Sequence, residues 1–184
     1  LDFAESALAT GPGAEWLFAA APSVAAGASP VFLLGSSGRS SVTIFDVGTV
    51  PLIRAVHGAA AVDLVDFEVL TEPVQVLVDD LGFGQRSPLV PAPEGEVVFG
   101  FRANAAPEQP VASAIGTPVR GTEYLAALVD ADTGGEMLLE PSRLRSVVTE
   151  GRLRLAHLSA DGDLVSVHLT AAEDEPLSAD TRVL

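Results

Sequence analysis

The chain has 184 residues, 48% hydrophobic and 19% charged, and this balance excludes an intrinsically disordered protein. Its net charge of −15 comes from 25 acidic residues against ten arginines and no lysine, so nucleic acids and anionic membranes are poor partners. There is no cysteine, which rules out disulfides and thiolate metal sites. No apolar run reaches the roughly 18–20 residues of a membrane-spanning helix, so membrane insertion is not expected.

Short apolar runs separated by turn-forming residues predict an all-β protein. The stretch from Trp16 to Ala26 fits either a short helix or a strand. Several later runs alternate apolar and polar residues with a period of two, which is typical of half-buried strands. Their spacing of about ten residues favours a sandwich or a barrel. Examples of the expected strands are residues 30–34, 41–45, 52–56, 74–78, 96–101, 123–129 and 152–156.

An internal repeat is the strongest signal in the sequence. Arg54, His57 and Asp63 recur as Arg154, His157 and Asp163, which is an offset of 100. We interpret these six residues as structural repeat positions. At an offset near 94, residues 24–35 and 42–46 also resemble residues 119–129 and 136–140. In both copies a glycine turn precedes an apolar strand, and a polar hairpin leads to a second apolar strand ending in an acid.

The phase of the repeat predicts one complete β-sandwich module flanked by two complementary half-modules. Residues 1–48 correspond to the C-terminal half of a module, residues 49–148 to a complete module, and residues 149–184 to the N-terminal half of another. A half-sandwich leaves an apolar face and strand edges uncovered. The two halves therefore pair either within one chain or between neighbouring subunits. Because the chain starts at Leu1 and not at Met, it is expected to be a processed form or a fragment.

Three segments, residues 53–63, 81–95 and 121–125, resemble the domain-of-unknown-function family forty-three ninety-seven. That family occurs as tandem repeats in bacterial and archaeal cell-surface proteins. The resemblance implies an Ig-like antiparallel β-sandwich, an extracellular or cell-surface location and no agreed activity. The Asp/Pro-rich stretch that usually follows the histidine is here Gly58–Ala61, so the resemblance implies no ligand or metal role for that loop.

The repeated histidines, His57 and His157, each stand six residues before an aspartate. A catalytic His–Asp pair would need a nucleophile, yet the sequence has no cysteine and no G-x-S-x-G motif. A structural role, in which the side chain bonds a loop carbonyl, explains the repetition better. His168 is expected to be a surface residue on an alternating strand. We therefore do not expect an enzyme.

Asp130, Asp132 and Glu136 stand at positions one, three and seven of a possible calcium loop, with Gly135 at position six. Position twelve, which should be an acid, is Pro141. The cage is incomplete, so a plain β-turn is favoured and calcium remains the one cofactor considered.

Other polar and glycine-rich stretches have ordinary interpretations. Asp79 and Asp80 are interpreted as loop acids, and residues 35–41 as a flexible hairpin because the P-loop lysine is missing. Residues 81–84 place an aromatic side chain between glycines, which indicates a bulge or, alternatively, a ligand platform.

Three functional hypotheses follow. The preferred one is a non-enzymatic, secreted or cell-surface structural or adhesive protein that assembles into a fibre by head-to-tail strand complementation, with itself as partner. The alternative is an extracellular binding module for a glycan, calcium or a protein. A hydrolase is the third.

Overall fold

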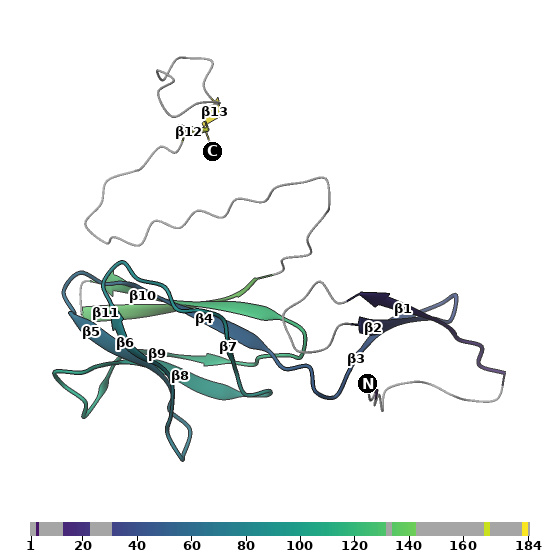
Figure 1. Ribbon diagram of the computed structural model, residues 1–184, viewed down its shortest axis with the longest axis horizontal. Coiled ribbons are helices and arrows are strands. Elements are labelled where there is room, and N and C mark those ends of the chain that lie inside the picture. The colour runs from purple at the N-terminus through teal and green to yellow at the C-terminus, as the bar shows by residue number, and fades with distance from the viewer. Residues whose placement is uncertain are drawn as a thin grey trace.

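The structure is a computed structural model, and it describes residues 3, 13–22, 31–131, 134–142, 168–169 and 182–183. All regular structure in this part of the chain is β-strand, which confirms the all-β prediction (Figure 1). Among the described residues there is no helix of the length and hydropathy needed to cross a membrane.

Residues 52–142 form two four-stranded sheets that face one another (Figure 1). The first sheet has the order β11-β10-β4-β7, made from Gly134–Ser142, Glu123–Ala131, Leu52–Gly58 and Val90–Pro91. The second has the order β6-β5-β8-β9, made from Gln75–Gly82, Leu64–Val69, Val97–Ala103 and Pro110–Gly116. This arrangement is a β-sandwich, as the sequence predicts.

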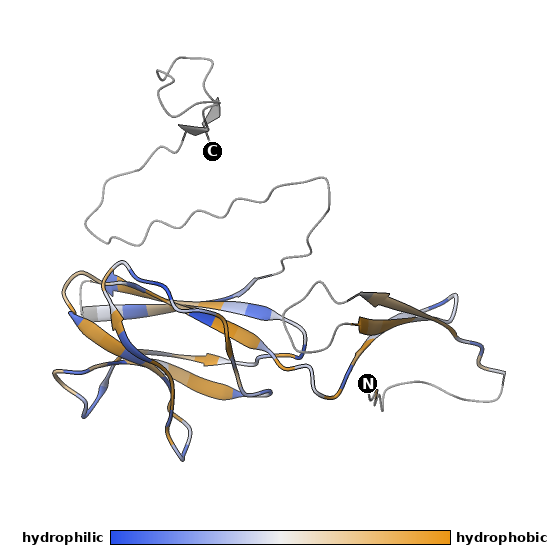
Figure 2. Ribbon diagram, in the orientation of Figure 1, coloured by the Kyte–Doolittle hydropathy of each residue, from blue (hydrophilic) through white to orange (hydrophobic). Residues whose placement is uncertain are grey.

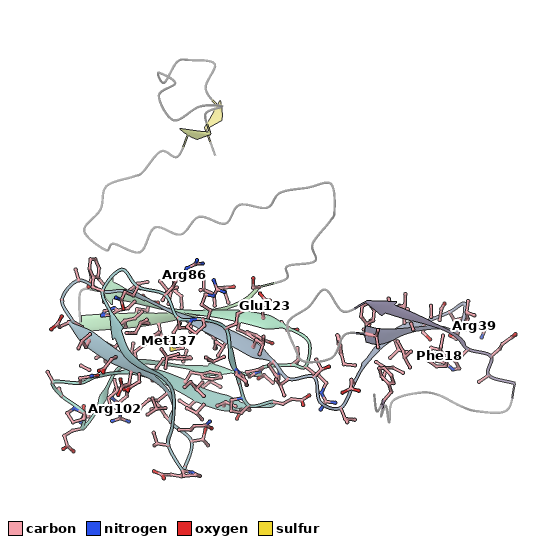
Figure 3. The ribbon with its side chains drawn as sticks, in the orientation of Figure 1. Phe18, Arg39, Arg86, Arg102, Glu123 and Met137 are labelled. Atoms are coloured by element: carbon pink, nitrogen blue, oxygen red, sulfur yellow. The ribbon has the colours of Figure 1, made fainter. Side chains whose placement is uncertain are left out.

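The core lies between these two sheets, where the apolar residues of both gather (Figure 2). Phe67, Phe99 and Phe101 are fully buried, with the Phe67 ring centroid 5.7 Å from that of Phe99 and 5.0 Å from that of Phe101. Ile53 and Leu128 meet them from the first sheet, and Met137 lies between the sheets (Figure 3). Alternation of buried and half-buried residues along β4 gives the pattern that a sheet with one core face requires.

The second sheet is tied together by an ion pair as well as by its hydrogen-bond ladder. Arg102 Nε on β8 donates to Glu68 Oε2 on β5 at 2.7 Å, and the Glu68 side chain is nearly fully buried. A buried carboxylate without such a partner would be costly, so the pair compensates for the charge that folding encloses.

One strand pair departs from the antiparallel sandwich that the sequence predicts. β4 and β10 run parallel, from Glu123 opposite Leu52 to Val129 opposite Gly58. All the other strand pairs in the described part of the chain are antiparallel. The chain passes through the whole second sheet between β4 and β10, so no hairpin turn forces them to run in opposite directions.

A separate three-stranded antiparallel sheet precedes the sandwich, and we call it the head sheet (Figure 1). Its order is β1-β2-β3, from Leu17–Pro22, Val31–Ser36 and Ser41–Phe45. It meets the sandwich where the Phe45 ring lies over Gly121: a Cβ at Gly121 would be 2.5 Å from Phe45 Cε1. Because Trp16 to Ala26 contains the strand β1, the strand interpretation is confirmed and the helix interpretation is wrong.

The predicted strands at 30–34, 41–45, 52–56, 74–78, 96–101 and 123–129 correspond to β2, β3, β4, β6, β8 and β10. Beyond β11 the structure describes only a short pair, β12 (His168–Leu169) with β13 (Arg182–Val183). The predicted strand at 152–156 and most of the half-module 149–184 lie outside the described residues. The three module boundaries stay a prediction.

Candidate functional site

His57 is a fully buried side chain at the end of β4. Its Nδ1 accepts a hydrogen bond from the Ala59 backbone N–H at 3.3 Å, so the neutral ring carries its proton on Nε2. Nε2 then donates to the Val62 carbonyl at 3.0 Å. The ring edge also meets Phe83, with centroids 6.2 Å apart. Both ring nitrogens are thus used to hold the loop that follows β4.

Burial lowers the pKa of His57 from 6.5, because charging the ring would cost desolvation. The backbone at Val62 and Asp63 and the carboxylates of Asp130 and Asp63 oppose this shift but do not cancel it. A neutral imidazole whose nitrogens are both bonded to backbone has no free acceptor for a substrate proton. The arrangement suits a histidine that holds the loop in place, and it offers no general base.

The other repeat positions lie near His57 but do not form a reactive group with it. Arg54 is half-buried on β4, and alternation along the strand puts its side chain on the face opposite His57. Asp63 is exposed, and Asp130 accepts a hydrogen bond from the Ala60 N–H at 3.1 Å. The matching residues of the second copy, Arg154, His157 and Asp163, lie outside the described residues.

Of the possible calcium-loop residues, Asp130 and Glu136 are not brought together. Asp130 pairs with Gly135 and Val129 pairs with Glu136, so Asp130 and Glu136 extend from opposite faces of the β10–β11 hairpin. Asp132 lies outside the described residues. The Asp130 carboxylate instead accepts a hydrogen bond from the loop after β4.

A different set of acids does converge, on the outer face of β5 and β6. One carboxylate oxygen each from Asp66, Asp79 and Asp80 lies within 4.8 Å of the others. Asp66 also accepts from the Asp80 N–H at 2.9 Å, and the Asn104 side chain donates to Asp80. Such oxygens are the ligand type that a hard divalent cation prefers.

Without a cation the three carboxylates repel one another. The charge of Asp80 is the largest cause that raises the pKa of Asp79, followed by a hydrogen bond and the charge of Asp66. The interpretation of Asp79 and Asp80 as loop acids is wrong, because both lie on β6, and nothing in the sequence indicated that Asp66 belongs with them. Shifts in the strand register on either side of Phe67 bring β5 and β6 into this alignment. No local sequence pattern predicts these shifts.

The two glycine-rich stretches are turns. Ser37 N–H donates to the Ser40 carbonyl at 3.0 Å, closing the β2–β3 hairpin with Gly38 at a φ of 76°. In the other stretch Phe83 is 57% exposed, and Gly84 takes a φ of 74° where the chain turns back along β4. Gly84 N–H then donates to the His57 carbonyl at 2.8 Å, so this stretch lies against His57.

The strands of the head sheet are largely apolar (Figure 2), and three of their large apolar side chains are exposed. Leu17 is 75% exposed, Leu34 45% and Phe18 42%. Phe18 lies across the Cα of Gly35, on the sheet face opposite Leu34 (Figure 3). Both faces of a three-stranded sheet therefore carry large apolar groups, which is unfavourable in water without a partner.

The β2–β3 hairpin repeats the pairing of the β10–β11 hairpin at the offset of 94. Leu34 opposite Thr43 becomes Leu128 opposite Met137, and Phe32 opposite Phe45 becomes Ala126 opposite Leu139. Equivalent positions differ sharply in burial: Leu34 is 45% exposed, whereas Leu128 is 0% exposed because the second sheet covers it. The head hairpin has the register of the sandwich hairpin, and its Leu34 face lacks the cover that Leu128 has, whereas Ile44 on its other face is only 5% exposed.

Comparisons of this chain with protein-family models, with curated proteins and with solved structures found no match. The family resemblance drawn from the sequence motifs stays a prediction.

Proposed function

We propose that this chain is a non-enzymatic structural protein of the extracellular space or cell surface, which joins copies of itself head to tail by adding a strand to the head sheet. The carrying observation is the contrast between Leu34, 45% exposed, and its register equivalent Leu128, fully buried. Completing that layer would remove apolar surface from water, at roughly 25 cal/mol for each Å² buried.

Strand addition is favoured over side-by-side packing because, in the part of the chain that the structure describes, the outer strands of the head sheet each have an edge with no strand paired to it. Within the described residues, β1 has β2 as its only strand neighbour, and β3 has no full strand beyond it. An edge strand presents unpaired backbone donors and acceptors that can pair with another chain. A head-to-tail contact of this kind does not close on itself and so generates a filament.

A structural role is also supported by the chemistry of the sandwich. His57 is neutral, enclosed and bonded on both nitrogens to backbone groups. The resemblance of its sequence motifs to surface-protein repeats favours an extracellular location.

The test compares two glutamate substitutions at exposed apolar positions. Leu34→Glu places a charge in the uncovered layer of the head sheet, so polymers seen for the wild type by light scattering and electron microscopy should disappear. Ile115→Glu is the matched control, because Ile115 is 70% exposed on β9 of the sandwich and its polymers should persist. Wild-type protein that remains monomeric at all concentrations would overturn the proposal.

A further inference from the structure

The head sheet and the first sheet of the sandwich have the same strand order. β10 lies between β11 and β4, and β2 lies between β3 and β1. The two hairpins correspond at the offset of 94. β1 therefore pairs with β2 on the side that corresponds to the side of β10 where β4 pairs. The occupants differ in direction: β4 runs parallel to β10, whereas β1 runs antiparallel to β2.

β1 has a sequence that is poorly suited to pairing with β2. Its residues Ala19 to Ala21 have small side chains and low strand propensity, and Pro22 lacks a backbone N–H for the ladder. Leu17 at its start is 75% exposed. An occupant with larger apolar side chains would cover more of β2 and β3.

The segment of the chain that matches β4 is residues 152–158. Arg154 and His157 repeat Arg54 and His57, and leucines stand at 153, 155 and 158. We infer that residues 152–158 of a second copy replace β1 and add to β2 in parallel. This inference rests on the proposed function and names the strand that performs it.

The pairing in the sandwich defines the register of the added strand. Ala126 opposite Ala55 becomes Phe32 opposite Leu155, and Leu128 opposite His57 becomes Leu34 opposite His157. At these two places β1 offers only Ala21 and Ala19. The exchange therefore puts a leucine against Phe32 and an imidazole ring against the exposed Leu34.

Within one chain β1 pairs along the whole of β2, from Leu17 opposite Ser36 to Pro22 opposite Val31, so an incoming strand has to displace β1. Charge favours a second copy as the source of that strand. Residues 143–154 hold four of the ten arginines and a single glutamate, in a chain of net charge −15. A basic stretch is attracted to the acidic surface of another copy.

Disulfide trapping tests the register, because the natural chain has no cysteine that could interfere. Leu34→Cys and His157→Cys are made as two separate proteins, mixed and oxidised. Directly opposed residues on neighbouring strands are about 5 Å apart, within the Cα range that a disulfide allows. A disulfide-linked heterodimer is expected. The control mixture, Leu34→Cys with Arg154→Cys, is three residues out of register and should lose that product.

A second variant fixes β1 on β2, so that no other strand can pair there. Ala19 and Leu34 are direct partners in one chain, so Ala19→Cys with Leu34→Cys should form an internal disulfide that holds β1 on β2. Polymers should be lost in the oxidised variant and recovered on reduction.

Each outcome has a separate meaning. Equal cross-linking of the matched and control mixtures, or polymers from the oxidised locked variant, would overturn the assignment while leaving head-to-tail assembly intact. A double variant, Leu34→Cys with His157→Cys, that forms only internally linked monomer would show that the strand belongs to its own chain and would overturn the second copy as occupant. Monomeric wild type by light scattering would instead overturn the proposed function.

Discussion

His57 determines how the loop after β4 is held, and it does so as a neutral ring. The Nδ1 acceptor and the Nε2 donor each meet a backbone group of residues 59–62. Protonation of Nδ1 would abolish its acceptor role and place a charge in a buried site. The hydrogen bonds by which His57 holds the loop are therefore sensitive to acid.

The pH dependence of stability follows from the lowered pKa of His57. The folded protein binds this proton less readily than the unfolded chain, where the pKa is 6.5, so stability is complete above that value and is lost as the pH falls below it. His57→Gln keeps an N–H donor but cannot be protonated. We expect the variant to be less stable at neutral pH by about 1–2 kcal/mol, and its deficit to shrink as the pH falls.

Urea unfolding of both proteins between about pH 8 and pH 5 measures this difference. The other titrating groups are common to both proteins, so the difference between the curves isolates residue 57. Parallel curves over the whole range would show that His57 does not titrate on unfolding.

Individual residues were the hardest features to predict. The repeat pointed to His57 and to a loop carbonyl as its partner, but no sequence pattern specifies which backbone atoms a loop presents. Asp66 was missed for a related reason, because it meets Asp79 and Asp80 only through the pairing of β5 with β6 and its register shifts. The spacing of Asp130 and Glu136 suggested a shared site, yet strand alternation separates them.

At the scale of elements, most strands rich in apolar or branched side chains were predictable, although β5, Leu64–Val69, was not among the expected strands. Strands defined by their neighbours were not predictable. β9, Pro110–Gly116, contains small residues and is a strand because β8 pairs along it. β7 has two residues and depends on β4 in the same way. The parallel pairing of β4 with β10 joins residues far apart in the sequence, which local periodicity cannot report.

The contact between the head sheet and the sandwich depends on Gly121. Its φ is 71°, and an added Cβ would lie 2.5 Å from the Phe45 ring. Gly121→Ala should cost about 1–2 kcal/mol for the backbone conformation alone, and it should also push Phe45 away. Limited proteolysis near β3 and chemical denaturation should both show the loss.

Gly84→Ala is the matched control for this substitution. Gly84 has a φ of 74°, but an added Cβ there would meet nothing within 4 Å. It shares the backbone strain and lacks the Phe45 contact. Equal proteolysis near β3 in both variants would mean that the Phe45–Gly121 contact does not hold the head sheet.

For the whole molecule, the net charge of −15 opposes self-association. Salt screens this repulsion, because the Debye length falls from about 30 Å at 0.01 M to about 8 Å at 0.15 M. Polymer formation should therefore increase as sodium chloride is raised through this range, as followed by light scattering. A decrease would indicate that attraction between the basic stretch 143–154 and the acidic surface dominates the contact.

The parallel pair β4–β10 also determines how a filament of such copies would carry tension. Leu52, where the chain enters the sandwich, is opposite Glu123, and Glu123 is opposite Ser142, where the chain leaves. Entry and exit thus stand two strand spacings apart, about 10 Å, in one row at the same end of the sheet. A pulling force would pass along this row and load the hydrogen bonds of β4–β10 and β10–β11 one after another. The phenylalanine core would lie beside the line of force, so each sandwich would yield by peeling from this end before its core is strained.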